Sequence, residues 1–554
     1  MARSIIDPIT RIEGHLRVEM EVNNGVVTDA WVSGGCFRGM ELVVQDRTPE
    51  DAAHIVQRIC GVCPVSHAHA SSIAAEKAYG ITIPNNARII RNLIEGGQFL
   101  HSHILWFYTL AALDYVNPLN ALKANVGNAY DLVEAAGTSC QSDLKALKEK
   151  LASFAANGQM SIFSGAWFLD GAVPEEYALS PELDLICTAH YIEALSMQAK
   201  ASEVCALLGG KMPHVMTLVP GGTAFVPTEE KLDDLWSLVN EIYDWVKATM
   251  IPDTKAIAPA YTAALKFGKG CGRYVSWGVF ESPSFEMSER YLPSGVINEK
   301  LQLSEVNEDL IKEYVGHSWY VGDSNLNPRE GVTDPKFTEY YSDPEKQIVS
   351  DRYTWSKGPS YDGQCMEAGP FSRVLAAYLR GNKFIKTNLD GLCSDLGLTL
   401  SDLQSTLGRV AARQVESLYV ATLMKEWVAE LIEAVKGGDS EYFRAPSKLS
   451  GDGTGFWEAP RGALYHTEHV NNGKISGYQI IIPTTWNIAP RNAEGVHGPM
   501  EQALIGTPVN NVEMPINALR TVHSFDPCTA CAVHVNEPAT GKHFETVTSP
   551  WGVK

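Results

Sequence analysis

The chain has 554 residues, of which 45% are hydrophobic and 20% are charged, so a large buried core is expected. Its formal net charge of −20 argues against nucleic acid or an anionic membrane surface as a partner. No stretch reaches the roughly 20 apolar residues of a membrane-spanning helix, and the start of the chain lacks the apolar run of a secretory signal. A periplasmic or membrane address would therefore have to come from a partner.

Two segments, one near each end of the chain, have the pattern of β-hairpins. Residues 16–32 alternate like a half-buried strand and are interrupted by Asn24-Gly25, a pair typical of a two-residue type I′ turn. Residues 464–482 repeat this pattern around Asn472-Gly473. We therefore expect small β regions near both ends of the chain.

The residues between the hairpins are mostly helical in pattern. Thr48-Pro49-Glu50-Asp51 predicts a helix start, with an N-cap, a proline at N1 and an acidic first turn. Apolar periodicity predicts long helices over 86–116, 181–208, 229–250 and 400–435, whereas residues 270–361 look irregular. The glycine-rich run 451–455 follows no clear strand and opens no helix, so an ordinary loop is expected rather than a nucleotide-binding loop.

These elements predict an α+β protein that is mainly helical, with a core of long helices. No internal repeat or low-complexity linker separates one part of the chain from another. We therefore expect residues 1–534 to form one interlocked domain.

Seven of the eleven cysteines stand alone in the sequence and are interpreted as small buried hydrophobic residues: Cys36, Cys140, Cys187, Cys205, Cys271, Cys365 and Cys393. The other four form two C-x-x-C pairs near opposite ends of the chain, Cys60 with Cys63 and Cys528 with Cys531. Residues three apart share one face of a helix, so each pair can point two sulfurs at one metal. Four thiolates suit zinc, an iron–sulfur cluster or a soft transition metal. Spacing alone leaves a structural zinc site, a catalytic centre and a redox disulfide open.

The residues around the second pair predict a helix start. Asp526 can cap, Pro527 can take N1, and Cys528 then falls in the first turn, where the helix N-terminus stabilises a thiolate. A histidine follows each pair at similar spacing, His67 after the first and His534 after the second. We expect at least one of them to serve the site.

At this point the motifs resemble those of the large subunit of uptake-type nickel–iron hydrogenases, in the precursor form. Residues 58–67 resemble the family's R-x-C-G-x-C-x-x-x-H motif, and residues 526–534 resemble its D-P-C-x-x-C-x-x-H motif. Four further signatures match in the expected order, at residues 11–15, 37–41, 458–462 and 483–487. The resemblance covers the chain from about Ile5 to His534 and implies the fold of that subunit.

The resemblance implies a nickel ion held by all four cysteine sulfurs, with Cys60 and Cys528 terminal. Cys63 and Cys531 would bridge to an iron that carries carbon monoxide and two cyanides. Thr484 would hydrogen-bond a cyanide, and Pro460 and Arg461 would line the iron's diatomic ligands. A second metal, magnesium or iron, would be bound by Glu41, His534 and the backbone carbonyl of Ile480.

One residue departs from the family pattern. Ser102 stands where many relatives have an aspartate that pairs with the arginine matching Arg461. Asp526 remains available, so we expect the pocket to survive with altered electrostatics.

The resemblance implies reversible heterolytic oxidation of dihydrogen. We expect Cys528, a terminal thiolate, to take the proton and pass it to Glu13. Arg461 is the alternative base, but the normally high pKa of a guanidinium argues against it. From spacing alone, Glu13 would be interpreted as an exposed carboxylate or as a salt-bridge partner of Arg11.

The electrons need a second chain, because the remaining cysteines are too scattered to ligate iron–sulfur clusters. The resemblance implies an iron–sulfur small subunit, which carries the export signal, and through it a membrane cytochrome. The expected location is periplasmic and membrane-associated, with the cytoplasm as the alternative. Residues 535–554 are expected to be a maturation extension, removed after His534 by an endopeptidase once insertion factors have delivered nickel.

Three rival interpretations remain. The related quinone-site subunit of respiratory complex I lacks the four nickel cysteines, and hydrogen-sensing regulatory hydrogenases usually lack the C-terminal extension. A structural zinc protein without turnover is the third.

Overall fold

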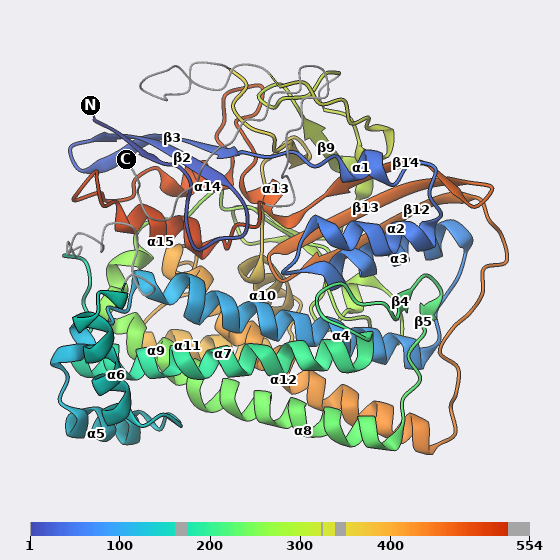
Figure 1. Ribbon diagram of the computed structural model, residues 1–554. Coiled ribbons are helices and arrows are strands. Elements are labelled where there is room, and N and C mark those ends of the chain that lie inside the picture. Colours follow the sequence, from blue (N-terminus) through green and yellow to red (C-terminus); the bar gives the residue numbers. More distant parts are fainter. Residues whose placement is uncertain (1, 161–174, 323–324, 338–350, 530–554) are drawn as a thin grey trace.

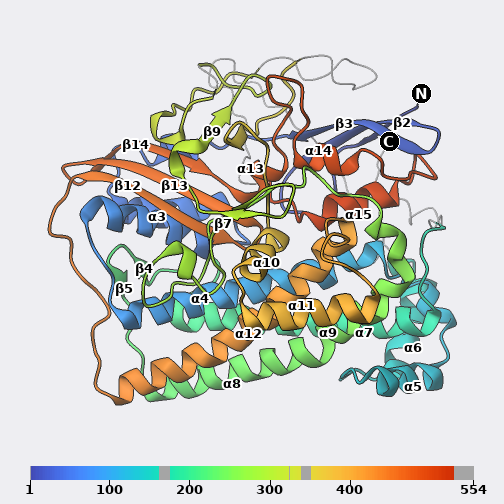
Figure 2. The ribbon, with the colours of Figure 1, turned by 180° about the vertical axis from the view of Figure 1, so that it is seen from behind.

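Long helices packed side by side form one half of the molecule. In a computed structural model, which describes residues 2–160, 175–322, 325–337 and 351–529, α4, α7, α8 and α12 run along one another (Figure 1). The view from behind shows the same layer, with α10 and α11 beside α12 (Figure 2). The bounds of these helices are Asn85–Ile104 (α4), Pro181–Gly209 (α7), Glu229–Trp245 (α8), Pro370–Leu379 (α10), Lys383–Leu396 (α11) and Thr406–Lys436 (α12).

The predicted long helices are confirmed, but two of them are not continuous α-helix. The segment predicted over 86–116 is α-helical only to Ile104, continues as a π-helix over Leu105–Ala111, and ends in a 3-10 turn. The segment predicted over 229–250 likewise ends in a π-helix, Val246–Met250. The last long helix begins at Thr406 rather than near 400, where Ser405 caps it by accepting the N–H of Gly408.

Two three-stranded antiparallel sheets lie over the helical layer. The first is β1-β2-β3 (Ala2–Ile6, Leu16–Asn23, Val26–Gly34), and the second is β12-β13-β14 (Gly451–Ala459, Gly462–Asn471, Lys474–Ile481). Both predicted hairpins are confirmed, because Asn24-Gly25 and Asn472-Gly473 form their turns with positive φ at both residues.

The glycine-rich run 451–455 is not a loop, and that prediction was wrong. It begins β12, and Gly451, Gly453 and Gly455 all face α3 (Pro64–Tyr79). A Cβ at Gly453 or Gly455 would lie 1.9 or 1.8 Å from the carbonyl oxygen of Ala74 or Ala70. Every second residue of the strand faces the helix, and every fourth residue of the helix faces the strand. Because these residues are glycines on the strand and alanines on the helix, the two backbones can touch.

The remaining elements are short. The described part of residues 270–361, which leaves out 323–324 and 338–350, contains only strands of two to four residues and 3-10 turns, as the irregular pattern predicted. The other strands are Leu218–Val219 (β4), Gly222–Thr223 (β5), Tyr274–Ser276 (β6), Gly295–Ile297 (β7), Leu303–Ser304 (β8), Ile311–Tyr314 (β9), Gly358–Tyr361 (β10) and Glu367–Ala368 (β11). The other helices are Met40–Val43 (α1), Pro49–Ile55 (α2), Val126–Ala136 (α5), Leu144–Ala156 (α6), Ile251–Ile257 (α9), Pro483–Asn487 (α13), Pro499–Leu504 (α14) and Ile516–Ser524 (α15).

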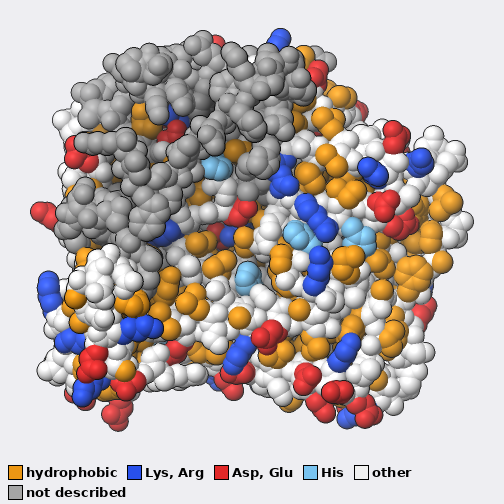
Figure 3. Space-filling model, viewed as in Figure 1, with side chains coloured by type: hydrophobic (Ala, Val, Ile, Leu, Met, Phe, Trp, Pro, Cys, Tyr) orange, Lys and Arg blue, Asp and Glu red, His pale blue; other side chains and the backbone are white. Residues whose placement is uncertain are grey.

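The surface agrees with the composition. On the face seen in Figure 3, acidic and basic side chains are interspersed with hydrophobic ones rather than gathered into one basic patch. Within the described ranges, no helix combines the length and the apolar character needed to cross a lipid bilayer.

Candidate metal centre

Three cysteines from opposite ends of the chain meet at the junction of the two sheets. Cys60, Cys63 and Cys528 are each no more than 3% exposed, and their sulfurs lie within 4.8 Å of one another. The Sγ atoms of Cys60 and Cys528 are 3.2 Å apart. Cys531 and His534 lie outside the described residues. The structure therefore brings together the described members of the two predicted pairs.

The prediction that the two sulfurs of the first pair share one face of a helix was wrong. They converge through a turn instead. Cys60 has extended backbone after a 3-10 helix, and its Sγ accepts the N–H groups of Val62 and Cys63 at 3.3 and 3.2 Å. Cys63 is the N-cap of α3, with Pro64 at N1. The helix N-terminus that was predicted for Cys528 thus stands at Cys63 instead.

The segment around Cys528 is extended, so the helix start predicted there was wrong. α15 ends at Ser524, and Asp526 takes a positive φ of 54° that turns the chain away. Cys528 then pairs with Glu13 as a parallel β-bridge, in which Thr529 N–H donates to the Glu13 carbonyl. The Cys528 N–H donates to Thr484 Oγ1 at 3.0 Å. Backbone pairing between the two ends of the chain, rather than a helix cap, fixes the position of this sulfur.

Glu13 faces the sulfur of Cys528. Its Oε2 lies 3.1 Å from Cys528 Sγ, within hydrogen-bonding distance. Arg11, the alternative partner suggested by spacing, forms an ion pair with Asp114. Glu13 therefore lies beside the cysteines, as the resemblance implied. The alternative from spacing, a salt bridge between Glu13 and Arg11, is not the one found, because Arg11 pairs with Asp114.

A buried arginine lies beside the cysteines with the predicted counter-ion. Arg461 Nη2 is 2.9 Å from Asp526 Oδ1, and its Nη1 donates to Ser102 Oγ at 3.2 Å. Burial opposes the charge, but Asp526 and the neighbouring cysteines more than compensate, so the pKa of Arg461 is raised above its usual value. A second guanidinium, that of Arg413, lies 3.8 Å from the other oxygen of Asp526, and burial lowers its pKa to about 10.

The crowding of three buried thiols has an electrostatic consequence. Contacts with Cys528 and Cys60, followed by burial, raise the pKa of Cys63 well above its usual value. Three thiolates at this spacing repel one another unless a cation lies among them. The donor set is soft and closely spaced, which fits a soft or borderline transition metal.

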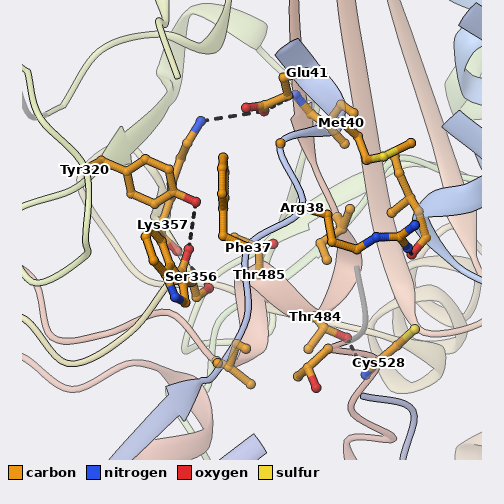
Figure 4. Close-up of a pocket in the computed structure, with 18 of the residues that line it drawn as sticks. Phe37, Arg38, Met40, Glu41, Tyr320, Ser356, Lys357, Thr484, Thr485 and Cys528 are labelled. Carbon is orange, nitrogen blue, oxygen red and sulfur yellow. Dashed lines mark hydrogen bonds and ion pairs between the residues drawn. The ribbon is translucent and has the colours of Figure 1, made fainter. Parts of the chain in front are cut away.

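A cavity of about 110 Å³ extends from Cys528 to Glu41. Figure 4 shows Thr484 beside Cys528 at one end and Lys357 pointing toward Glu41 at the other. At that end, Glu41 Oε1 accepts the N–H of Ile480 at 2.9 Å and lies 3.6 Å from Lys357 Nζ. The predicted pair Glu41 and Ile480 is thus adjacent.

Sequence reasoning missed two charged groups at this end of the cavity. Lys357 Nζ lies 3.3 Å from Glu313 Oε2 and donates to Gln479 Oε1 at 2.9 Å. Burial opposes the charge of Lys357, but Glu313 and Glu41 raise its pKa. Neither residue belongs to a motif, so only the fold reveals them.

The histidine after the first pair belongs to a buried polar chain. His67 Nδ1 lies 3.1 Å from His466 Nε2, and His466 Nδ1 lies 2.7 Å from the hydroxyl of Tyr478. Burial lowers the pKa of His67 to about 4 and that of His466 well below its usual value, so both rings are neutral near pH 7. His466 lies in none of the motifs described above, and no spacing signal predicted it.

The scattered cysteines follow their prediction only in part. Four of the seven are buried: Cys187, Cys205, Cys271 and Cys393. The other three are partly exposed, contrary to the prediction: Cys36, Cys140 and Cys365.

Comparison with known proteins agrees with this geometry. A sequence model of a family described as nickel-dependent hydrogenase matches residues 38–534, and one described as HoxL-like matches residues 4–33. The chain is 38% identical to the hydrogenase-2 large chain of Escherichia coli K12, with 96% of this chain and 97% of the relative aligned. It is 37% identical to the uptake hydrogenase large subunit of Rhodobacter capsulatus, with 98% and 97% aligned. Among solved structures, the Ni-Fe-Se hydrogenase of D. vulgaris Hildenborough superimposes with a TM-score of 0.78 at 34% identity, over 96% of this chain and 100% of that one.

Proposed function

The chain belongs to the nickel-dependent hydrogenase family as a large subunit, and we propose, from that premise, which of its residues carry the reaction. It is an enzyme that oxidises dihydrogen at a nickel–iron centre, in a mainly helical fold shared with other hydrogenase large subunits. The named relatives are large chains or subunits, so this chain pairs with a small subunit.

We assign the nickel to the four cysteine sulfurs. Cys60 and Cys528 would be its terminal ligands, and Cys63 and Cys531 would be shared with the iron. The close spacing and burial of the three described thiols support this assignment, because a cation among them offsets the mutual repulsion of their thiolates. When bound, the centre polarises dihydrogen and takes up its two electrons.

The contact between Cys528 and Glu13 carries the proposed acid–base chemistry. The Cys528 sulfur, as a thiolate, accepts the proton, and the Glu13 carboxylate at 3.1 Å receives it next. Arg461 holds its own proton too firmly to serve as the base, since the neighbouring Asp526 and cysteines raise its pKa. Its role is to present a fixed positive charge to the centre.

The residues around the iron are assigned to its diatomic ligands. Pro460 and Arg461 would line the carbon monoxide and the two cyanides, and the Thr484 hydroxyl would donate to a cyanide. The hydroxyl oxygen of Thr484 already accepts the N–H of Cys528, and its hydrogen can still donate. Pro460 is held by its carbonyl, which accepts from Arg373 at 2.7 Å.

We assign a second metal, magnesium or iron, to Glu41, the Ile480 carbonyl and His534. The carboxylate of Glu41 supplies a hard oxygen donor of the kind that magnesium prefers. The ammonium of Lys357 lies 3.6 Å from Oε1 of the same carboxylate.

The rest of the proposal concerns assembly. Residues 1–534 form one domain, and an endopeptidase removes 535–554 after nickel-insertion factors have loaded the site. The small subunit carries the iron–sulfur clusters and directs the complex to the periplasmic side of the membrane, where a cytochrome accepts the electrons. A hydrogen-sensing role is the second candidate; the match to uptake hydrogenase large subunits favours the enzyme.

Hydrogen-dependent dye reduction by the purified complex of the two subunits tests this function. We expect turnover in the wild type and its loss in Cys528→Ser, since a hydroxyl is a poor ligand for nickel and a poor proton acceptor. Turnover in Cys528→Ser equal to that of the wild type would refute the assignment. A Cys393→Ser variant, changed at a buried cysteine on α11, is the control and should keep full activity.

A further inference from the structure

A second cluster of ligand-type side chains lies at one end of the helical layer. Helices α5 and α6 pack against the end of α7, and the loop between them carries Cys140 (Figure 1). The potential ligand atoms of Cys140, His190 and Glu193 lie within 4.8 Å of one another. His190 and Glu193 are buried on one face of α7, and Cys140 is partly exposed.

His190 is oriented as a metal-ligating histidine is. Its Nδ1 lies 2.8 Å from both carboxylate oxygens of Asp253, which in turn accepts the hydroxyl of Tyr108 at 2.8 Å. The carboxylate therefore holds the proton on Nδ1. Burial opposes the charge of the ring, but Asp253 and Cys140 raise the pKa of His190 to about 10, so a cation at Nε2 has to displace the ring's second proton. Nε2 is buried and makes no hydrogen bond of good geometry within the described residues, although the thiol of Cys140 faces it.

Glu193 is held in place beside the same thiol. Its Oε1 accepts the N–H groups of Gln141 and Ser142 at 2.8 and 2.9 Å and lies 3.8 Å from Cys140 Sγ. These bonds alone could serve to fasten the loop to α7. The hydrogen bonds of Glu193 do not explain why the buried Nε2 of His190 and the thiol of Cys140 face each other next to this carboxylate.

We propose that Cys140, His190 and Glu193 bind a divalent cation of the kind that prefers nitrogen and sulfur, zinc above all. With Zn–S near 2.3 Å and Zn–N or Zn–O near 2.0 Å, ligand atoms of a tetrahedral site lie about 3.5 Å apart. Here Cys140 Sγ and Glu193 Oε1 are 3.8 Å apart, and the three ligand atoms lie within 4.8 Å of one another. A thiolate, a neutral imidazole and a carboxylate balance the charge of the ion, and water takes the fourth position. Asp253 is the positioning residue for His190.

The order of the Cys140 thiol, the His190 imidazole and the Asp253 carboxylate also occurs in thiol hydrolases. Here Glu193 occupies the space beside the sulfur that an electrophilic carbon would need. The geometry favours a cation over a substrate.

Zinc analysis of the two-subunit complex, purified without a polyhistidine tag and equilibrated with zinc sulfate before removal of loose ions, tests the proposal. The wild type should retain zinc in an amount equal to the large subunit, and Cys140→Ser should lose it. Asp253→Asn should weaken zinc binding by about 10- to 100-fold. Cys365→Ser is the matched control, since Cys365 is also a partly exposed cysteine, and it should retain zinc.

Two further readings keep the outcome decisive. Nickel content equal to that of the wild type shows that a variant is folded and loaded, so failure of this proposal is separate from failure of the proposed hydrogenase assignment. Zinc X-ray absorption on the wild type alone should show one sulfur neighbour among nitrogen and oxygen neighbours. Equal zinc in the wild type and in Cys140→Ser, or a zinc spectrum without sulfur, would overturn the proposal.

Discussion

The contact of 3.1 Å between Cys528 Sγ and Glu13 Oε2 is the residue-scale feature on which the proposed proton transfer depends. In Glu13→Gln the amide keeps the size of the side chain but cannot take up a proton. We expect hydrogen-dependent dye reduction to fall by about 10²- to 10⁴-fold, because a general base is removed. Nickel and iron content, measured on the same sample, should be unchanged.

Glu50→Gln is the control for this change, since Glu50 is an exposed carboxylate in the first turn of α2. It should turn over like the wild type. Wild-type turnover in Glu13→Gln would remove Glu13 from the proton path.

The ion pair between Arg461 and Asp526 is the second residue-scale feature. Two guanidinium groups, Arg461 and Arg413, share the single carboxylate of Asp526, and all three side chains are about 1% exposed. In Asp526→Asn both cations lose their counter-ion, which should lower the free energy of unfolding by about 3–5 kcal/mol. The melting temperature of the complex, recorded at a fixed scan rate, measures this loss.

Ser102 provides a rescue for that variant. Its hydroxyl accepts from Arg461, so Ser102→Asp in the Asp526→Asn background returns one carboxylate to the cluster and should recover part of the lost stability. Ser102→Asn, which is neutral and of similar size, should not. Equal melting temperatures for the wild type and Asp526→Asn would contradict the account.

At the scale of elements, the contact between β12 and α3 positions the first cysteine pair. Cys63 is the N-cap of α3, and the helix backbone touches the strand at Gly455, where an added Cβ would lie 1.8 Å from Ala70 O. In Gly455→Ala the helix must move away from the strand and carry its N-terminus with it. We expect the variant to purify with much less nickel than the wild type.

The matched control is Gly391→Ala, on α11. A Cβ there meets no atom within 4 Å, so the helix should gain stability, and nickel content should not change. A Gly455→Ala variant with wild-type nickel would show that the close contact of helix and strand is not needed for the site.

Sequence signals predicted the elements that depend on neighbouring residues. Asn24-Gly25 encodes a hairpin because both residues adopt positive φ at low cost, and Thr48 caps α2 by accepting the N–H of Asp51, as expected. The run 451–455 was wrongly predicted as a loop, because its glycines pack against α3, a helix that lies far away in the sequence. Local patterns cannot report such a contact.

The same limit explains the outcome at the site. The two C-x-x-C motifs identified the sulfurs, but the helix predicted at Cys528 was wrong because a parallel β-bridge to Glu13 overrides the local capping pattern. Lys357, Glu313 and His466 carry no motif, and their roles depend on neighbours that only the fold supplies.

At the scale of the whole molecule, the site exists only where the two ends of the chain meet. Cys60 and Cys63 come from the start of α3, and Cys528 follows α15, with Glu13 from the N-terminal region paired to it. A metal that binds both ends ties the N- and C-terminal regions together, so loss of one cysteine should remove the metal and not merely reduce the rate.

Nickel and iron analysis of the purified two-subunit complex tests the central claim most directly. We predict nickel in an amount equal to the large subunit, iron as well, and loss of the nickel in Cys63→Ser. Absence of nickel from the wild-type complex, or full retention of nickel in Cys63→Ser, would contradict it.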